Sequence, residues 1–211
     1  MSNFIENANW RYATKKFDTT KKVSPADLET LKKAMSLTAT SYGLEPYKIL
    51  IIENQDLKSQ LVAASWGQQI VADASHLIVF ANILDFGSDQ MNAYFENVVS
   101  TRNVPMEALQ GYSNFMQASI NAMPLEKRNS WTAKQTYLAM NNLLNACAEL
   151  KIDATPMEGI VPEQYNQILG LNELGLNAVL ATPIGYRHTD DATQQYAKVR
   201  KAPQDLFITH K

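Results

Sequence analysis

The segment of residues 131–150 constrains the fold most. It contains no Gly or Pro, and its large apolar side chains are spread around much of a helical circumference. A helix that is apolar on most sides must be covered on most sides. We therefore expect a central helix, buried by other elements through Tyr137, Leu138, Met140, Leu143, Leu144, Cys147 and Leu150.

Two runs dense in β-branched residues, at residues 47–53 and 76–82, predict strands. Both runs are mainly apolar, so we expect both strands to be buried on two faces and central in a sheet. A short extended piece ends at Thr155 and Pro156, and residues 176–186 predict a further strand. The strands are few and separated by helices of unequal length, which is typical of the α+β class.

Capping residues and prolines mark the remaining helices. Ser24 followed by Pro25 forms a good N-cap and first-turn pair. Proline breaks a helix interior because it lacks the backbone N–H, but it is tolerated in a first turn. The predicted helices are residues 3–10, one opened by Pro25, two within residues 87–127 broken near Pro105 and Pro124, and one opened by Pro162.

The composition is that of one globular unit. With 45% apolar and 19% charged residues and no repeat or linker, residues 1–211 are expected to form a single domain. The net charge of -2 argues against general binding to nucleic acid or to anionic membranes. The lone Cys147 indicates a reducing compartment, and the first residues lack the apolar run of an export signal. We expect a cytoplasmic protein without a membrane span.

Common catalytic motifs are absent from the sequence. It has no P-loop, no GxGxxG after a strand, no GxSxG, no HExxH and no paired Cys/His spacing. The histidines, at positions 76, 188 and 210, are far apart in the sequence. We therefore expect no metal site.

Two basic clusters lie at opposite ends of the chain, RYATKK at residues 11–16 and KVRK at residues 198–201. If folding brings them together, their Arg and Lys side chains form a phosphate site without a glycine-rich loop. The alternative is two solvated basic segments.

Two polar loops contain glycine. TATSYGLEPYK, at residues 38–48, suits hydrogen bonding to a polar ligand, and TPMEGI, at residues 155–160, permits close approach to a flat one. The alternative for residues 38–48 is an ordinary connection between a helix and a strand. The alternative for Glu158 is a solvated loop carboxylate.

Taken in order, these segments resemble the nitroreductase family of flavoproteins. The motifs are RYATKKFD, TATSYGLEPYKILII, DASHLIVFAN, WTAKQTYLAMNNLLNACAELKIDATPMEGI, TPIGYR and KVRKAPQD, and they run through most of the chain. The subgroup with the greatest likeness contains bacterial NAD(P)H-dependent nitroreductases, flavin reductases and dihydropteridine reductases.

The resemblance implies a nitroreductase-like α+β fold, with a central, mostly antiparallel sheet flanked by helices. It also implies an intertwined homodimer with exchanged C-terminal tails, and two FMN molecules in the subunit interface. Each flavin would contact both chains, and NAD(P)H would serve as the co-substrate.

Site residues follow from the resemblance position by position. Lys15 and Glu158 are the catalytic candidates: Lys15 matches a lysine beside the N1/O2 edge of the flavin, and Glu158 acts mainly through its position. The segment Pro156–Gly159 matches the stretch over the flavin face, and Thr40, Ser41 and Gly43 match a loop from the neighbouring subunit. The cofactor-binding candidates are Arg11, Tyr12, Ala13, Lys15, Thr40, Ser41, Gly43, Gln68, Gln69, Gln135, Pro156, Met157, Glu158, Gly159, Lys198 and Arg200.

The sequence departs from the family pattern at four positions. Ala13 replaces a common Ser, and Glu45 a common Gln. Gly67 and Ile70 stand where many members have Asn and Lys, so Gln68 or Gln69 is expected to substitute. The phosphate-binding cations all remain, so we expect flavin binding with altered affinity and an open substrate preference.

The resemblance further implies ping-pong hydride transfer from NAD(P)H through FMN to a nitroaromatic, quinone, flavin or pterin acceptor. Tyr112, Phe115 and Phe95 are candidates for the substrate cleft, with helix packing as their alternative role. The preference for NADH or NADPH stays open. Two other functions are a diverged flavoenzyme, such as a dehalogenase or enoate reductase, and a flavin-binding dimer with a sensor or interaction role.

Overall fold

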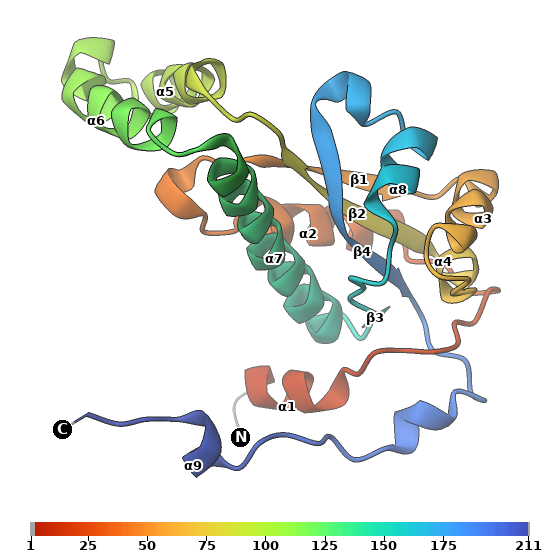
Figure 1. The fold of residues 1–211 in the computed structure, drawn as a ribbon. Helices are drawn as coiled ribbons and strands as arrows, with labels where there is room; N and C mark the ends of the chain where they lie inside the picture. The colour runs from red at the N-terminus through yellow and green to blue at the C-terminus, as the bar shows by residue number, and fades with distance from the viewer. Residues whose placement is uncertain (1–2, 211) are drawn as a thin grey trace.

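The computed structural model describes residues 3–210 and is built on an antiparallel sheet. Its strand order is β1-β2-β4-β3, and each neighbouring pair is antiparallel. The strands are β1 (Tyr47–Ile52), β2 (His76–Ile83), β3 (Asp153–Ala154) and β4 (Leu176–Gly185). The predicted α+β class, with its central antiparallel sheet, is confirmed (Figure 1).

The first two strands differ in position, which corrects one expectation. β2 pairs on both sides and is buried along its length except at Ile83. In the described part of the chain β1 pairs with β2 alone, and Lys48 is exposed. The expectation that both strands are central is therefore wrong for β1, because an apolar run does not show which side of a strand lacks a partner.

One face of the sheet is covered by α7 (Leu125–Glu149) and α2 (Pro25–Ser36). The inward residues Leu143 and Cys147 of α7 share a buried cluster with Ile78, Phe80 and Leu180 of the sheet. The helix and its burial against the sheet are thus confirmed, but Tyr137 and Leu138, which were expected to be buried, are 40% and 45% exposed, so one side of the helix is uncovered. It begins at Leu125, directly after the N-cap residue Pro124, so the predicted helix break near Pro124 is confirmed.

The other face is covered by α3 (Gln55–Ala63), α4 (Ile70–Asp73) and α8 (Pro162–Ile168). Their side chains Leu61, Val71 and Tyr165 pack with Leu77 and Val79, the strand residues that alternate with the first face. The sequence analysis did not predict α3 or α4.

Helices α5 (Ser88–Arg102) and α6 (Gln110–Asn121) form a hairpin that stands away from α3, α4 and α8 (Figure 1). The break near Pro105 is confirmed, and the hairpin has its own apolar cluster, which includes Phe86, Phe95 and Met116. Short 3-10 helices complete the chain: η1 (Ser41–Gly43), η2 (Met106–Leu109), η3 (Asn172–Leu174) and η4 (Ala192–Gln195).

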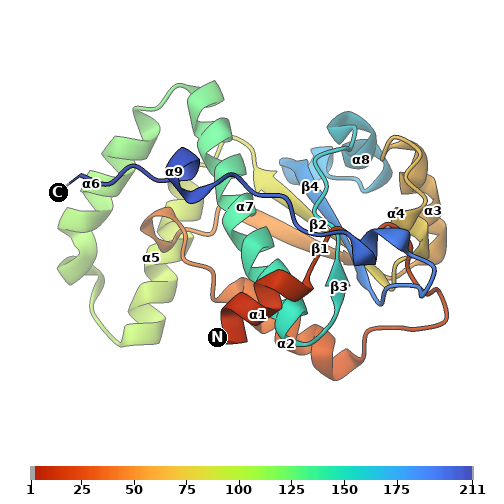
Figure 2. The same cartoon turned by 90° about the horizontal axis from the view of Figure 1, so that it is seen from below.

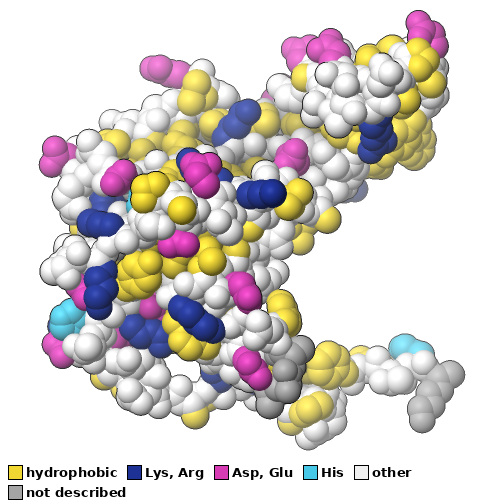
Figure 3. Space-filling model, turned by 180° about the vertical axis from the view of Figure 1, so that it is seen from behind, with side chains coloured by type: hydrophobic (Ala, Val, Ile, Leu, Met, Phe, Trp, Pro, Cys, Tyr) yellow, Lys and Arg dark blue, Asp and Glu magenta, His cyan; other side chains and the backbone are white. Residues whose placement is uncertain are grey.

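The two ends of the chain run on the same side of the molecule. α1 (Asn3–Trp10) packs against α7, and in Figure 2 the chain after β4 runs across the view in front of α7 to α9 (Pro203–Leu206). The last described residues form an arm that extends from the body (Figure 3). Across residues 3–210, no helix combines the length and apolar character needed to span a membrane.

Candidate functional site

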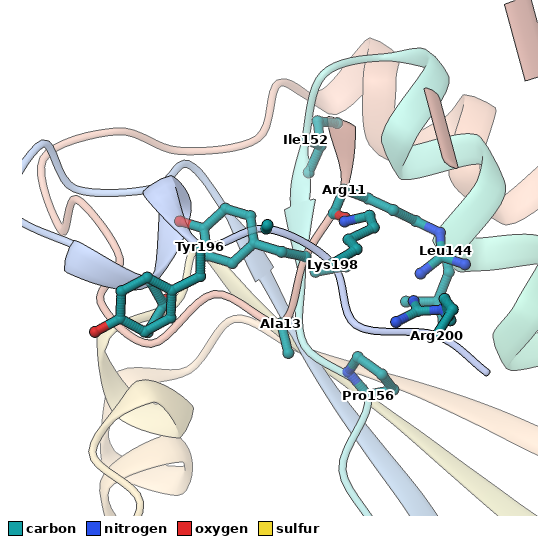
Figure 4. A pocket seen from close by; sticks show the side chains of 12 residues that line it. Arg11, Ala13, Leu144, Ile152, Pro156, Tyr196, Lys198 and Arg200 are labelled. Atoms are coloured by element: carbon teal, nitrogen blue, oxygen red, sulfur yellow. The ribbon is translucent and has the colours of Figure 1, made fainter. Parts of the chain in front are cut away.

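The two basic clusters meet around a cavity of about 350 Å³. Arg11 comes from the loop after α1, whereas Lys198 and Arg200 come from the tail, and their side chains converge in Figure 4. The Lys198 ammonium donates a hydrogen bond to the Arg11 carbonyl oxygen. This space, the phosphate cavity below, is lined by Arg11, Tyr12, Ala13, Leu144, Ile152, Ala154, Pro156, Thr193, Tyr196, Ala197, Lys198 and Arg200.

The N-terminal loop is held against the core by its backbone. The Thr155 hydroxyl donates to the Thr14 carbonyl at 2.7 Å, and the His188 amide donates to the Lys16 carbonyl at 2.9 Å. Phe17 forms an isolated β-bridge with Arg187. The loop therefore enters the core between β3 and the end of β4, where the tail also begins.

The phosphate cavity concentrates positive charge. Its lining, as far as the structure describes the chain, contains three cations and no carboxylate. Burial, and then the charges of Arg11 and Arg200, lower the pKa of Lys198 below its ordinary value. The buried Nε of Arg11 has no hydrogen-bond partner in the described chain. Crowded cations with an unsatisfied donor fit an anionic group such as a phosphate.

A second cavity, of about 330 Å³, adjoins the first at Pro156, which lines both. It brings together Lys15 and Glu158, the two catalytic candidates, although they are far apart in the sequence. This space, called the flavin-face cavity below after the ligand that the resemblance implies, is lined by Lys15, Trp66, Gln68, Thr155, Pro156, Met157, Glu158 and Gly159.

The segment after β3 lies beside β4 and reaches into the flavin-face cavity. The Met157 amide donates to the Ala181 carbonyl at 2.8 Å, which fixes the segment to the sheet. The Tyr137 hydroxyl donates to a Glu158 carboxylate oxygen at 2.6 Å, and this hydrogen bond is the main cause that raises the pKa of Tyr137 to about 12. Among the described residues, the amides of Glu158 and Gly159 donate no hydrogen bond to the protein.

Gly159 is required by a close approach. A Cβ atom there would lie 3.0 Å from the Trp66 ring and 3.1 Å from the Gln68 amide nitrogen. Gln68 lines the cavity and donates to the Gly159 carbonyl at 3.3 Å, whereas Gln69 donates to Asp73 and lines neither cavity. Trp66, which the sequence analysis did not single out, is 72% exposed and has a positive φ of 57°.

Comparison with known proteins identifies the family. The model of the nitroreductase family matches residues 8–186. The chain belongs to the nitroreductase family. It is 32% identical over 210 residues to the major NAD(P)H-flavin oxidoreductase of Aliivibrio fischeri, with 96% of each chain covered.

Solved structures of nitroreductases share the fold. A Bacillus subtilis nitroreductase superposes with a TM-score of 0.88 at 17% identity, covering 98% of each chain. A nitroreductase from Exiguobacterium sibiricum, solved in complex with FMN, gives a TM-score of 0.86 at 19% identity. It covers 100% of this chain and 98% of its own. The nitroreductase-like fold predicted from the sequence is confirmed.

Four of the cofactor-binding candidates lie close to one another and line neither cavity. The Ser41 amide donates to the Gln135 side-chain oxygen at 2.8 Å, and the Glu45 amide donates to the Thr40 hydroxyl at 3.1 Å. Gly43 has a φ of 73° and packs against the Tyr94 ring. A single chain therefore does not place Thr40, Ser41, Gly43 and Gln135 in the lining of either cavity.

The three aromatic candidates for the substrate cleft also line neither cavity. For Phe95 the structure supports the alternative role, helix packing. Phe95 is 2% exposed and packs in the hairpin core, with its ring centroid 6.1 Å from that of Tyr112. Tyr112 and Phe115 are exposed on α6. Helical spacing in the sequence could not separate the inward from the outward aromatics of this hairpin.

Sequence reasoning also missed an aromatic and ionic cluster beside the phosphate cavity. The Arg187 guanidinium lies 4.2 Å from the ring centroid of Trp10 and 4.5 Å from that of Tyr12. Its Nε donates to the buried Asp153 carboxylate at 2.9 Å. The position of Arg187 directly after a predicted strand, in TPIGYR, was the one available signal.

Proposed function

We propose that the protein binds FMN with its phosphate among Arg11, Lys198 and Arg200, and that it reduces small acceptors with NAD(P)H. The observation that carries this proposal is the junction of a cationic cavity and an open cavity at Pro156. When bound, FMN supplies hydride acceptance and donation at N5. The family, an oxidoreductase family, agrees with this assignment.

The phosphate cavity supplies complementary donors. Arg11 and Arg200 offer planar guanidinium forks, and Lys198 offers a compact charge. Because no carboxylate competes for them among the described lining residues, a dianion would satisfy the donor that Arg11 leaves unpaired.

The flavin-face cavity supplies positive charge and free backbone donors. The structure shows no ion pair for Lys15 with another described residue, so its charge is available at the wall. The amides of Glu158 and Gly159 are available as donors. Tyr137 holds the Glu158 carboxylate at 2.6 Å, so Glu158 contributes through the position of its backbone.

The mechanism proposed for this cavity is ping-pong. NADH or NADPH would occupy the opening beside Trp66 and Gly159, give up its hydride and leave as the oxidised nucleotide. A flat acceptor would then enter the same opening and receive the hydride. Nitroaromatics, quinones, flavins and pterins all fit this description, because each is a flat conjugated molecule.

We further propose a homodimer in which the partner completes the site. Leu206, Phe207 and Ile208 are large, apolar and exposed on the arm of Figure 3. Such a patch is typical of an interaction surface. Thr40, Ser41 and Gly43 lie away from the cavities of their own chain, which fits contact with the partner's flavin.

The dimer is tested by removing residues 204–211 and measuring sedimentation velocity at several protein concentrations. We expect the full chain to sediment as a dimer and the truncated chain to dissociate more readily. A monomeric full chain that still holds FMN would contradict the proposal.

The redox activity is tested by the visible spectrum of the purified protein. We expect a flavin spectrum, release of FMN on heating, and bleaching by NADH or NADPH under anaerobic conditions. Bound FMN that neither nucleotide bleaches would favour a sensor or interaction role. A protein that takes up no FMN when it is supplied would remove the proposed function.

A further inference from the structure

Asp191 is a buried carboxylate between the two halves of the site. It is 3% exposed and lies just before η4, at the beginning of the tail. It is not a lining residue of the phosphate cavity or of the flavin-face cavity. Its contacts nevertheless reach residues that line each of them.

One oxygen of Asp191 is directed at the N-terminal loop. Oδ2 accepts hydrogen bonds from the Tyr12 hydroxyl at 3.0 Å, from the Lys15 amide at 2.7 Å and from the Lys16 amide at 3.2 Å. Tyr12 lines the phosphate cavity, and Lys15 lines the flavin-face cavity. A single oxygen atom therefore fixes the loop at a residue of each cavity.

The other oxygen is directed at the tail. Oδ1 accepts from the Thr193 amide at 3.0 Å and from the Thr193 hydroxyl at 2.6 Å. Thr193 also lines the phosphate cavity, and the chain runs from it to Lys198 and Arg200. Asp191 thus joins the loop that carries Arg11 to the segment that carries the other two cations.

The partners of Asp191 leave the site cations free. Its charge is met by backbone amides and by hydroxyl groups, and it forms no ion pair with Lys15. The adjacent Asp190 behaves differently, because it is exposed and pairs with the Lys16 ammonium at 3.2 Å. A carboxylate satisfied by amides can order a cationic loop without neutralising the charges that an anion needs.

Two contacts fix the side chain of Tyr12, one at its hydroxyl and one at its ring. Its hydroxyl donates to Asp191, while its ring faces the Arg187 guanidinium at 4.5 Å. Burial and the hydrogen bond to Asp191 raise the pKa of Tyr12 to about 12, so Tyr12 remains a donor at neutral pH. In Asp191→Asn, the side-chain NH2 group would point at backbone N–H donors, either those of Lys15 and Lys16 or that of Thr193.

We infer that Asp191 is a positioning residue that joins the N-terminal loop to the tail and thereby sets the affinity for the FMN phosphate. The inference rests on the proposed function, because it assigns the phosphate to the cavity between these two segments. Asp191 acts through Tyr12, Lys15 and Thr193 and touches no ligand itself.

The test is titration of the flavin-free protein with FMN and with riboflavin, which lacks the phosphate. The variants are Asp191→Asn and the matched control Asp190→Asn, which removes an exposed carboxylate at the next position. We expect Asp191→Asn to weaken FMN binding by roughly tenfold or more, in keeping with the loss of several hydrogen bonds to one charged group. Riboflavin affinity should change less, and Asp190→Asn should leave both unchanged.

A thermal melt of each flavin-free variant separates positioning from folding. An Asp191→Asn protein that melts cooperatively and has lost its preference for FMN over riboflavin supports the inference. If Asp191→Asn does not fold, Tyr12→Phe and Thr193→Val each remove one side-chain hydrogen bond to Asp191, one on the loop side and one on the tail side, and each should weaken FMN binding several-fold.

Unchanged FMN affinity in Asp191→Asn, or in both single-sided variants, would overturn the inference. Failure of the wild-type protein to bind FMN would instead remove the proposed function on which the inference rests.

Discussion

The two cavities that meet at Pro156 differ in what builds them. The phosphate cavity is formed by the two ends of the chain and concentrates Arg11, Lys198 and Arg200. The flavin-face cavity is formed by the segment after β3 and the turn at Trp66, and its described lining contains one cation, Lys15, and one carboxylate, Glu158. The phosphate cavity has positive charge with no carboxylate among its described lining residues. In the flavin-face cavity the backbone at Gly159 lies close to neighbouring side chains.

This difference teaches that anchoring and reactivity are separable in the molecule. An anion is held by Coulomb attraction and charge-assisted hydrogen bonds, which depend on the number of cations. A flat ligand depends on a surface that no side chain obstructs, as at Gly159. Substitutions in one cavity should therefore change affinity for the phosphate, and substitutions in the other should change the rate.

The largest effect is expected from removing two cations of the phosphate cavity. The double variant Arg11→Met/Lys198→Met should weaken FMN binding by about 3–6 kcal/mol, because each charge-assisted contact contributes about 1.5–3 kcal/mol. Fluorescence titration measures this loss. Lys16→Met, which removes a cation outside both cavities, serves as the control, and an equal loss there would show that net charge alone holds the flavin.

The next effect is expected at Gly159. Gly159→Ala places a methyl group against the Trp66 ring, so the ring must move within the flavin-face cavity. We expect the rate of flavin reduction by NAD(P)H to fall about tenfold, or about 1.4 kcal/mol, while the FMN to riboflavin affinity ratio is kept. Gly111→Ala, where no atom lies within 4 Å of the added carbon, is the matched control for stopped-flow measurements.

A smaller effect concerns acid stability. Burial alone would raise the pKa of Asp191, but the hydrogen bonds from Thr193, Lys15 and Tyr12 together hold it below its ordinary value. Its stabilisation is therefore complete above the unfolded pKa, near 4, and is lost as the pH falls through the lower folded pKa. Urea unfolding of the flavin-free protein should show wild type more stable than Asp191→Asn by about 1 kcal/mol at pH 7. A difference that stays constant down to pH 3 would contradict this assignment.

The smallest effect is expected from Tyr137→Phe. The change removes the hydroxyl that holds Glu158 but leaves the backbone of that segment fixed to β4. We expect about a threefold loss in kcat, or about 0.6 kcal/mol, with unchanged FMN affinity. Tyr186→Phe, which lines neither cavity, is the control in steady-state assays. A loss of FMN affinity in Tyr137→Phe would show that the two cavities are not separable.

The sequence predicted the elements whose pattern is local. The apolar circumference of α7, the proline-marked starts of α2 and α8 and the buried strand β2 all agree with the structure. Helix α4 escaped prediction because it has only four residues, and α3 because its buried side includes Lys58, a residue type that is normally exposed. The edge position of β1 depends on which strand lies beside it, which its own residues do not specify.

The candidate site was predictable where a charge or motif was conspicuous. The meeting of the two basic clusters and the approach of Lys15 to Glu158 agree with the predicted grouping. Asp191 was missed because its partners Tyr12 and Lys15 lie more than 170 positions away in the sequence. Trp66 was missed because an aromatic residue in an exposed turn carries no pattern.

The construction of the phosphate cavity from both chain ends has a consequence for biosynthesis. Arg11 is synthesised long before Arg200, so the anion site cannot exist until residue 200 has left the ribosome. The sheet and α7 can fold earlier, because their contacts lie within the part already synthesised. Cofactor loading is therefore confined to chains that extend past residue 200, and a product that stops before residue 198 should accumulate as a folded but colourless protein.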